Sequence, residues 1–403
     1  MMRERLHIRN LGPLKDVRMD DIRSVMVLVG ASGSGKSLIL KVLALMRHVC
    51  KKTILRQALK QAGVRKCPFK LRRDSYLQFS DFGTLVTSET SIEYSFSYND
   101  FQCDLVMDKD DFPFRDGAFP LPDEKAVGPF VKVAFIGDMR NLVSVWARRG
   151  SSLQDKFLDS YFSETYDLWD EAVSNGGVHE LELSYLGQRV SVERGELGRQ
   201  RVVLSDRDGR HVALERGASG QKASVPTSLV VDYLLNHYDY TKAIQRNLVE
   251  PIVTNVVANS GETSGIVDLK RLRSLTGRVL FVHVEEPELS LDPMTQISFA
   301  DSLMATFDRA CAARPEVAAS VTFTSHSPYW ITALNTIVEE RDNRFLTWDR
   351  LGGYHVLEDG TVASLRDEES HLLMTPNMDA ATERIDRRFG EATERNEVQD
   401  GAD

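Results

Sequence analysis

A glycine-rich segment at residues 30–37 contains the residue types that hold phosphate groups. It reads Gly30, Ala31, Ser32, Gly33, Ser34, Gly35, Lys36 and Ser37. This order fits the pattern G-x-x-x-x-G-K-[ST], between an apolar run that predicts a buried strand and one that predicts a helix. Glycines let backbone N–H groups point inward at phosphate oxygens, and the helix N-terminus adds partial positive charge. The segment therefore predicts a phosphate-binding loop, in which Lys36 contacts the β- and γ-phosphates and Ser37 ligates Mg²⁺. The alternative is a glycine-rich turn without a ligand.

Two acids follow a second apolar strand, predicted for residues 279–284. Glu285 stands where a central strand would present a carboxylate to the Mg²⁺. Glu286, one residue on, could polarise an attacking water as a general base. On its own, such a pair would more often be a solvated acidic turn, and the phosphate-binding loop makes the catalytic interpretation the stronger one. His283, inside the strand, is expected to be a packed core residue without a catalytic role.

Four segments together resemble one family of ATPases. Residues 285–293 resemble the E-E-P-E-x-x-L-x-P segment of ABC-type ATPases in the RecF, SMC and OLD group, and residues 324–328 look like its switch-histidine segment. Residues 217–222 resemble a shortened ABC signature, and residues 6–14 are similar to the group's N-terminal start. The motifs occur in the ABC order. The resemblance covers residues 4 to roughly 335.

The resemblance implies an ATP-sandwich homodimer. Each ATP, with its Mg²⁺, would lie between Lys36 and Ser37 of one chain and Ser219 and Gly220 of the other. A second helix N-terminus preceded by small residues can donate N–H and hydroxyl groups to a γ-phosphate. The alternative for Ser219 and Gly220 is a helix cap with a permissive turn residue.

The same resemblance assigns further roles around the nucleotide. Asp292 matches the D-loop position, where it would contact the partner chain's phosphate-binding loop. His326 would hydrogen-bond the γ-phosphate or the attacking water, which makes Glu286, His326 and Lys36 the expected catalytic residues. Arg140 resembles an arginine of the same subgroup and could face the nucleotide or the dimer seam, although a solvated turn residue is as plausible. Gln78 is a weak candidate for the Q-loop glutamine.

These residues must be positioned by an α/β fold, expected to be an ABC-type P-loop ATPase head. One lobe would be a mixed sheet with an antiparallel β subdomain, formed by residues 1–150 with 278–345. A smaller lobe, residues 151–277, would carry the signature, and residues 346–403 would be a C-terminal extension with an acidic tail. Within that extension, Asp359-Gly360 predicts a hairpin turn, and residues 377–389 predict a short helix with Met378, Ala381, Ile385 and Phe389 facing inward.

Composition limits the possible settings. The 403 residues carry a formal charge of −9, and no segment approaches the ~18 consecutive apolar residues of a membrane span. No signal peptide opens the chain, and its four cysteines are scattered, so a reduced cytoplasmic location without membrane contact is expected. Residues 51–73 contain nine basic side chains and no acid, and Lys52, Arg56 and Lys60 share one helical face. This stretch could bind nucleic acid, although a solvated helical face or a docking surface for an acidic partner is the more frequent meaning.

What the chain lacks shapes the functional hypothesis. It has no sustained heptads for SMC-type arms and no acidic metal cluster for an OLD-type nuclease. Glu368, Glu369 and His371 are interpreted as a polar loop. The sequence therefore predicts an ATPase that switches a separate effector, such as a nuclease or toxin. The resemblance implies that this switch acts in prokaryotic anti-phage defence. The alternatives are a RecF-like DNA-binding repair ATPase and a scaffold that assembles on ATP with negligible turnover.

Overall fold

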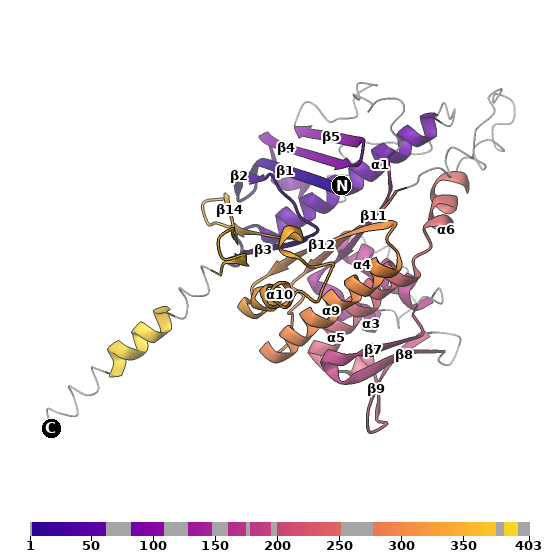
Figure 1. Cartoon of the computed structure of the whole chain (residues 1–403), viewed down its shortest axis with the longest axis vertical. Helices are drawn as coiled ribbons and strands as arrows, with labels where there is room; N and C mark the ends of the chain where they lie inside the picture. Colours follow the sequence, from indigo (N-terminus) through magenta and orange to yellow (C-terminus); the bar gives the residue numbers. More distant parts are fainter. Residues whose placement is uncertain are drawn as a thin grey trace.

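A six-stranded sheet lies at the centre of the computed structural model, which describes residues 2–61, 82–108, 128–146, 160–174, 178–194, 200–250, 277–375 and 383–393 (Figure 1). Its strand order is β14-β13-β3-β12-β11-β6, and all neighbours are parallel except β13 and β14. The strands are β3 (Val25–Gly30), β6 (Phe130–Ile136), β11 (Arg278–Glu285), β12 (Val317–Ser325), β13 (Leu351–Val356) and β14 (Val362–Ser364). The central strands are buried along nearly their whole length because helices or a second sheet cover both faces.

One face of this sheet is covered by the helix that follows the phosphate-binding loop and by a four-stranded antiparallel sheet. The helix, α1 (Lys36–Gln61), packs against β3, β6, β11 and β12. The antiparallel sheet has the order β2-β1-β4-β5. Its strands are β1 (Met2–Leu11), β2 (Leu14–Met19), β4 (Val86–Tyr98) and β5 (Phe101–Asp108). Together these elements bury one continuous apolar core.

The opposite face of the sheet carries the helices of the second core. These are α4 (Ser160–Ser174), α5 (Ser219–Asp232), α9 (Pro293–Ala313) and α10 (Pro328–Glu340). A short η2 (Asp138–Leu142) and α3 (Val143–Trp146) follow β6 and lie against α4 and α5. Because β3, β11 and β12 contribute side chains to this core as well, the sheet fixes α5 and α9 relative to the phosphate-binding loop.

A smaller antiparallel sheet precedes α5, with the order β10-β9-β8-β7. Its strands are β7 (Glu180–Leu183), β8 (Gln188–Arg194), β9 (Gln200–Asp206) and β10 (His211–Ala213). After α5 the chain continues through η7 (Tyr233–His237), α6 (Tyr240–Ile244) and η8 (Gln245–Val249), of which η7 and η8 are π-helical. Short helical turns occur at η1 (Gly83–Leu85), η4 (Ser184–Leu186), η6 (Leu214–Arg216) and η9 (Trp348–Arg350).

These elements confirm the predicted α/β class, with a mixed sheet, an antiparallel β subdomain and a smaller lobe that leads into residues 219 and 220. One difference concerns residues 351–364, which the sequence pattern placed in a C-terminal extension. They form the predicted hairpin, but its first strand pairs in parallel with β3, so this hairpin belongs to the central sheet. A small ladder of β15 (Arg366–Asp367) and β16 (Leu372–Leu373) follows it.

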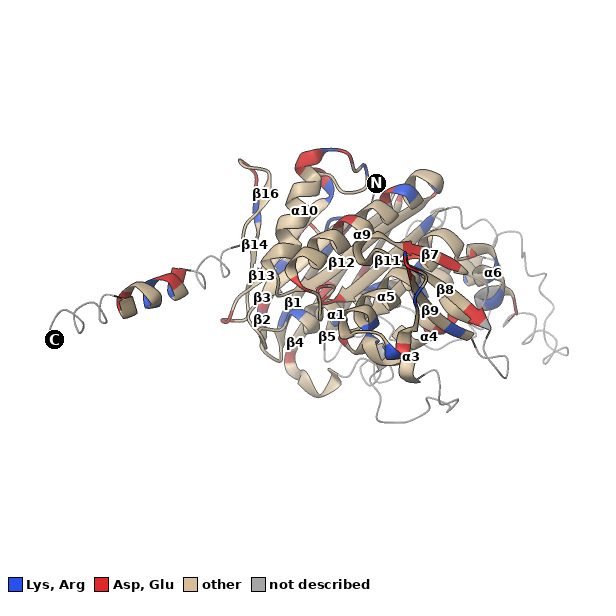
Figure 2. Ribbon diagram, turned by 90° about the horizontal axis from the view of Figure 1, so that it is seen from below, with Lys and Arg blue, Asp and Glu red and all other residues tan. Residues whose placement is uncertain are grey.

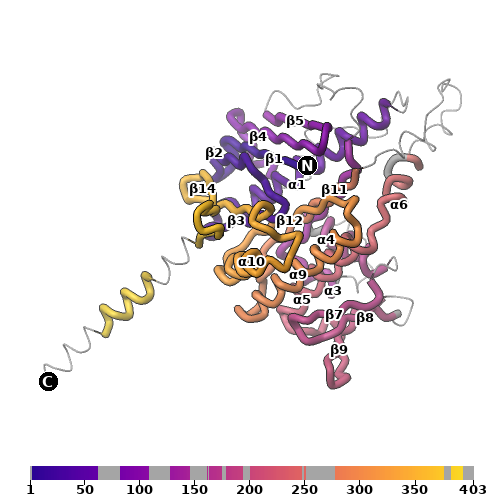
Figure 3. Tube along the Cα trace, in the orientation of Figure 1, coloured from indigo at the N-terminus to yellow at the C-terminus, as the bar shows by residue number. Residues whose placement is uncertain are grey.

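The C-terminal helix differs from its prediction. It spans residues 383–393 and lies apart from the rest of the chain, as the tube in Figure 3 shows. Ile385 is 67% exposed and Phe389 is 75% exposed, so the expectation that both face inward is wrong. Residues 383–389 are helical as predicted, while residues 377–382, with Met378 and Ala381, lie outside the described residues. An apolar stripe does not specify what covers it. Figure 2 shows basic and acidic residues mixed along this helix. Among the described helices, none is long and apolar enough to cross a membrane.

A buried polar cluster joins α1 to both sheets. The guanidinium of Arg47 donates to both carboxylate oxygens of Glu4, at 2.9 and 2.7 Å, and all of these atoms are fully buried. Arg47 Nη1 also lies 2.9 Å from His283 Nε2. Because a guanidinium only donates, Nε2 of His283 accepts, and its Nδ1 donates to the carbonyl oxygen of Ala134 at 2.9 Å. The predicted packing of His283 in the core is confirmed, with a hydrogen-bonded role in place of a purely apolar one.

Candidate nucleotide site

Three positions of the phosphate-binding loop have backbone conformations that favour glycine, and at two of them a side chain would also clash. Gly30 has φ +153°, and a Cβ there would lie 2.5 Å from the carbonyl oxygen of Val356 on β13. Gly35 has φ +105°, and a Cβ there would lie 2.6 Å from Leu14. The loop therefore packs closely between β13 and the start of β2. The loop therefore has its shape before any ligand arrives, as a site for phosphate requires.

Lys36 is held inside this loop. Its Nζ donates to the carbonyl oxygens of Gly30 and Ala31, at 3.0 and 2.8 Å, and the side chain is 5% exposed. Burial lowers the pKa of Lys36, and the carboxylates of Glu286 and Glu288 partly oppose this effect. A buried ammonium bound to loop carbonyls can exchange those weak partners for phosphate oxygens, which are stronger acceptors.

The side chains fit ATP with Mg²⁺. The hydroxyl of Ser34 is buried and has no hydrogen-bond partner within the described part of the chain, so a polar group of a ligand would satisfy it. A Cβ on Gly33 would meet no atom within 4 Å, so this side of the loop is open. In the described ranges, no group of three or more His, Cys, Asp or Glu side chains could hold a metal by itself. A metal bound here would take phosphate oxygens as further ligands.

The predicted metal ligands are brought together. Burial raises the pKa of Glu285 at the end of β11, and a hydrogen bond from Ser37 works in the opposite direction. Glu285 Oε2 also accepts the backbone N–H of Asp138 at 3.4 Å. A hydroxyl and a carboxylate in contact, at the start of α1 and the end of β11, are ligands that Mg²⁺ prefers.

Glu286 and His326, both predicted to act at the γ-phosphate or the attacking water, lie next to each other in the structure. His326 Nε2 lies 3.5 Å from Glu286 Oε1, and about a third of each side chain is exposed (37% and 34%). Burial and the charge of Lys36 lower the pKa of His326, while Glu286 raises it. Glu286 has φ +42°, a conformation that costs a non-glycine residue on the order of 1–3 kcal/mol. Its N–H bonds the carbonyl oxygen of Thr324 at 3.0 Å, which holds this strained residue beside His326.

Arg140 is not the solvated turn residue that was one of its predicted places, because its side chain is fully buried. It donates to the carbonyl oxygens of Glu285 and Glu286 at 2.6 Å each, of Gly137 at 3.1 Å, and of Ala223 in α5 at 2.8 Å. Burial lowers the pKa of Arg140 to about 10, and nearby carboxylates oppose that effect. Sequence reasoning missed this role because the partners are backbone atoms up to 146 residues away.

Asp292 caps a helix in this chain. Its Oδ1 accepts the N–H groups of Met294 and Thr295 at 3.1 and 3.2 Å, and its Oδ2 accepts the Thr295 hydroxyl at 2.5 Å. The sequence contains the signal for this role, because an aspartate followed by Pro293 is a typical start of a helix. Contact with a partner chain therefore stays a prediction for Asp292, and its carboxylate already has partners within its own chain.

The signature segment begins α5, and its serine is not the cap. The N-cap residue is Ala218, whose N–H is bonded by the side chain of Gln221 at 2.8 Å, so Ser219 is exposed and is not used for capping. Gly220 fits closely against the D-loop, the segment that leads to Asp292, because a Cβ there would lie 2.8 Å from the carbonyl oxygen of Ser290. The signature and the D-loop of one chain thus touch each other.

The basic stretch is described only in part. Lys52 and Arg56 are half-buried on α1 and Lys60 is exposed, while residues 62–73 and Gln78 lie outside the described residues. Nucleic-acid binding by residues 51–73 therefore stays one of the possibilities that the sequence leaves open, beside a solvated face and a docking surface.

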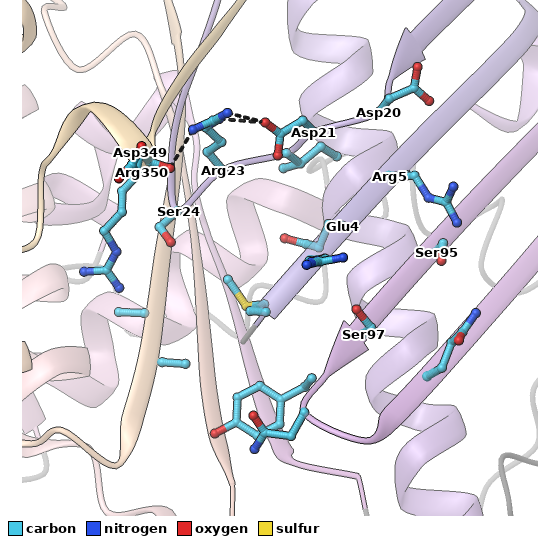
Figure 4. A pocket seen from close by; sticks show the side chains of 18 residues that line it. Glu4, Arg5, Asp20, Asp21, Arg23, Ser24, Ser95, Ser97, Asp349 and Arg350 are labelled. Carbon is cyan, nitrogen blue, oxygen red and sulfur yellow. Dashed lines mark hydrogen bonds and ion pairs between the residues drawn. The ribbon is translucent and has the colours of Figure 1, made fainter.

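A separate cavity of about 990 Å³ lies at the other end of β3 (Figure 4). Ser24 lines it, whereas the phosphate-binding loop begins six residues later, a separation of roughly 20 Å along an extended strand. Its charges are of both signs, and Arg23 is already bonded to Asp21 and to the carbonyl oxygen of Asp349, at 2.7 Å each. The cavity has no preference for an anion and is not part of the nucleotide site.

Comparison with known proteins gives a distant structural likeness and no family match. No protein-family model and no curated protein matches this chain. The SMC head domain from Thermotoga maritima is 12% identical with a TM-score of 0.37, covering 91% of this chain and 99% of that structure. An SMC head bound to the C-winged helix domain of ScpA is 12% identical with a TM-score of 0.36, covering 91% of this chain and 98% of that structure. A Pyrococcus furiosus SMC head with an extended coiled coil, bound to the C-terminal domain of ScpA, is 11% identical with a TM-score of 0.35. This match covers 92% of this chain and 98% of that structure.

Proposed function

We propose that this chain is an ABC-type, Mg²⁺-dependent ATPase that hydrolyses ATP to ADP and phosphate. The observation that supports it most directly is the convergence of five side chains from separate segments on one edge of the sheet. They are Lys36, Ser37, Glu285, Glu286 and His326. Phosphate binding, metal ligation and activation of water each need one or two of these groups, and a glycine-rich turn without a ligand would need none of them.

The residues divide the work of hydrolysis as follows. Lys36 would bind the β- and γ-phosphates. Ser37 and Glu285 would hold Mg²⁺, which would supply charge neutralisation at the phosphate oxygens. Glu286 accepts a proton from the attacking water, because it is the carboxylate that is partly exposed next to the loop. His326, 3.5 Å from Glu286, contacts the γ-phosphate or the same water.

The proposal extends to a homodimer that acts as a switch. Ser219 is exposed and Gly220 lies at the start of α5, so these residues are available to a nucleotide on a second copy. ATP would close the dimer and hydrolysis would open it. We propose that this cycle takes place in the cytoplasm and controls a separate effector, such as a nuclease or toxin, in anti-phage defence. That last step is an analogy with the group that the sequence resembles.

Steady-state ATP turnover, with and without Mg²⁺, tests the enzymatic part. Wild type should release phosphate only with Mg²⁺. Lys36→Ala should lose ATP binding, and Glu286→Gln should bind ATP with turnover lower by about a hundredfold or more, since general-base catalysis contributes about 10²–10⁴-fold. Lys60→Ala, a lysine exposed at the end of the same helix, is the matched control and should match wild type.

Three outcomes would redirect the proposal. Unchanged turnover in Glu286→Gln would remove Glu286 from the catalytic role. A wild type that binds ATP and assembles without measurable turnover would indicate an assembly scaffold. Turnover that DNA stimulates, with DNA affinity that falls as salt rises, would indicate a DNA-binding repair ATPase.

A further inference from the structure

A continuous set of hydrogen bonds joins the acidic turn after β11 to the loop that carries His326. Glu288 Oε1 accepts the backbone N–H of His326 at 2.6 Å and the hydroxyl of Ser325 at 2.9 Å. The Ser325 oxygen in turn accepts the N–H of Ser327 at 3.0 Å. One carboxylate oxygen therefore fixes the backbone on both sides of the switch histidine.

The same loop is bonded to the D-loop through a second side chain. The Ser327 hydroxyl donates to Oε1 of Gln296, and Nε2 of Gln296 donates to the carbonyl oxygen of Leu291 at 2.8 Å. The N–H of Gln296 donates to the carbonyl oxygen of Asp292 at 2.9 Å. The N–H of Leu291 donates to the carbonyl oxygen of Glu288 at 3.0 Å, so the bonds run from Glu288 through residues 325–327 and Gln296 back to Glu288 and close a ring.

The ring lies in a shielded part of the chain. Ser325 is fully buried, Ser327 is 7% exposed and Gln296 is 9% exposed. Hydrogen bonds at low local dielectric are stronger than in water, and a closed network of them holds one geometry. In the described ranges Glu288 makes no hydrogen bond to Lys36 or Ser37, and its charge acts on Lys36 only through space.

We propose that Glu288 is a positioning residue that holds His326 opposite Glu286, and that Gln296 and Ser327 make the D-loop and the histidine loop move as one unit. This inference deepens, and rests on, the proposed ATPase function. Its consequence is directional. A shift of His326 on loss of the γ-phosphate reaches Leu291 and Ser290, and Ser290 is the residue that Gly220 of α5 touches.

A spectroscopic experiment tests the positioning without requiring hydrolysis. Full-length protein labelled at histidine ¹³Cε1 is prepared as wild type, Glu288→Ala and Glu288→Gln, and the His326 resonance is assigned by its loss in His326→Gln. Glu288→Ala should move this resonance and change its titration, because the backbone N–H of His326 loses its acceptor. Glu288→Gln should leave both close to wild type, because an amide oxygen still accepts that N–H. An unmoved resonance in Glu288→Ala would overturn the proposal.

Turnover provides the second readout. Glu288→Ala should lower kcat about tenfold or more while the Kd for ATP changes less than about threefold, and Glu288→Gln should recover most of kcat. Ser327→Ala removes only the bond to Gln296 and should have a smaller effect in the same direction, so it replaces Glu288→Ala if that variant does not fold. Thr336→Ala, whose hydroxyl bonds only within α10, is the matched control.

The two proposals fail in different ways. If wild type does not turn over ATP, the proposed function fails, and the His326 resonance still decides whether Glu288 positions it. If wild type is active and Glu288→Ala has wild-type kcat and an unmoved resonance, the positioning role fails and the ATPase stands.

Discussion

Two arginines among the described residues are fully buried, and they bond different kinds of acceptor. Arg47 lies between α1 and the two sheets, in a two-bond ion pair with Glu4. Burial alone lowers the pKa of Arg47, but the Glu4 carboxylate outweighs it, so the pKa is raised overall. Arg140 has no such pair and bonds only carbonyl oxygens, and burial lowers its pKa to about 10.

We expect the two kinds of bonding to have different consequences, for stability at Arg47 and for the proposed turnover at Arg140. Arg47 and Glu4 satisfy each other, so their pair stabilises the position of α1 and leaves no charge for chemistry. Arg140 bonds backbone carbonyl oxygens of three segments, namely the turn at Gly137, the turn at Glu285 and Glu286, and helix α5 at Ala223. An arginine bonded in this way fixes the strained backbone of Glu286 and ties it to the signature helix.

The largest expected effect is on stability, from Arg47→Ala. Removing one partner of a buried pair leaves the Glu4 carboxylate uncompensated, so the free energy of unfolding should fall by about 3–5 kcal/mol. Guanidinium unfolding followed by circular dichroism measures it. The double variant Glu4→Leu with Arg47→Met should lose less than the single one, because no charge remains buried. A single variant as stable as wild type would contradict the structural role.

The next effect is on turnover, from Arg140→Ala. The backbone of Glu286 loses a charged donor, so kcat should fall about a hundredfold, which corresponds to about 2.7 kcal/mol in the barrier. The Kd for ATP should stay within about threefold, because the phosphate-binding loop is untouched. Arg140→Lys should not restore kcat, since one ammonium cannot bond carbonyls on several sides as the planar guanidinium does. If Arg140→Ala lost stability but kept normal turnover per folded molecule, Arg140 would have only a stabilising role, like Arg47.

The phosphate-binding loop is the part of the site that the sequence predicts best, for a physical reason. Its shape depends on glycine at Gly30 and Gly35 and on the strand and helix next to them, all within a short segment. The acids after β11 were found in the same way, because an apolar strand ending in carboxylates is a local pattern. The sequence assigned roles to Glu286 and His326 separately, and the structure shows that they meet because β11 and β12 pair in parallel and end at one edge.

The remaining features depend on contacts that no local pattern contains. Arg140 bonds residues 83 to 146 positions away, and Glu288 bonds a loop 37 and 38 positions away. β13 was not expected in the central sheet because Gly352 and Gly353 weaken its strand pattern, and only its pairing with β3 places it there. The stripe of Ile385 and Phe389 identified a helix, but burial depends on a surface that the stripe does not specify.

The measurement that tests the central claim most directly is the solution mass of Glu286→Gln by light scattering, with and without ATP and Mg²⁺. A site that binds ATP but cannot activate water should hold two chains together, so the mass should rise from 45.4 kDa to about twice that value only when both ATP and Mg²⁺ are present. Glu286→Gln combined with Lys36→Ala should stay at the mass of one chain. A mass that does not change although ATP is bound would contradict the ATP-sandwich switch.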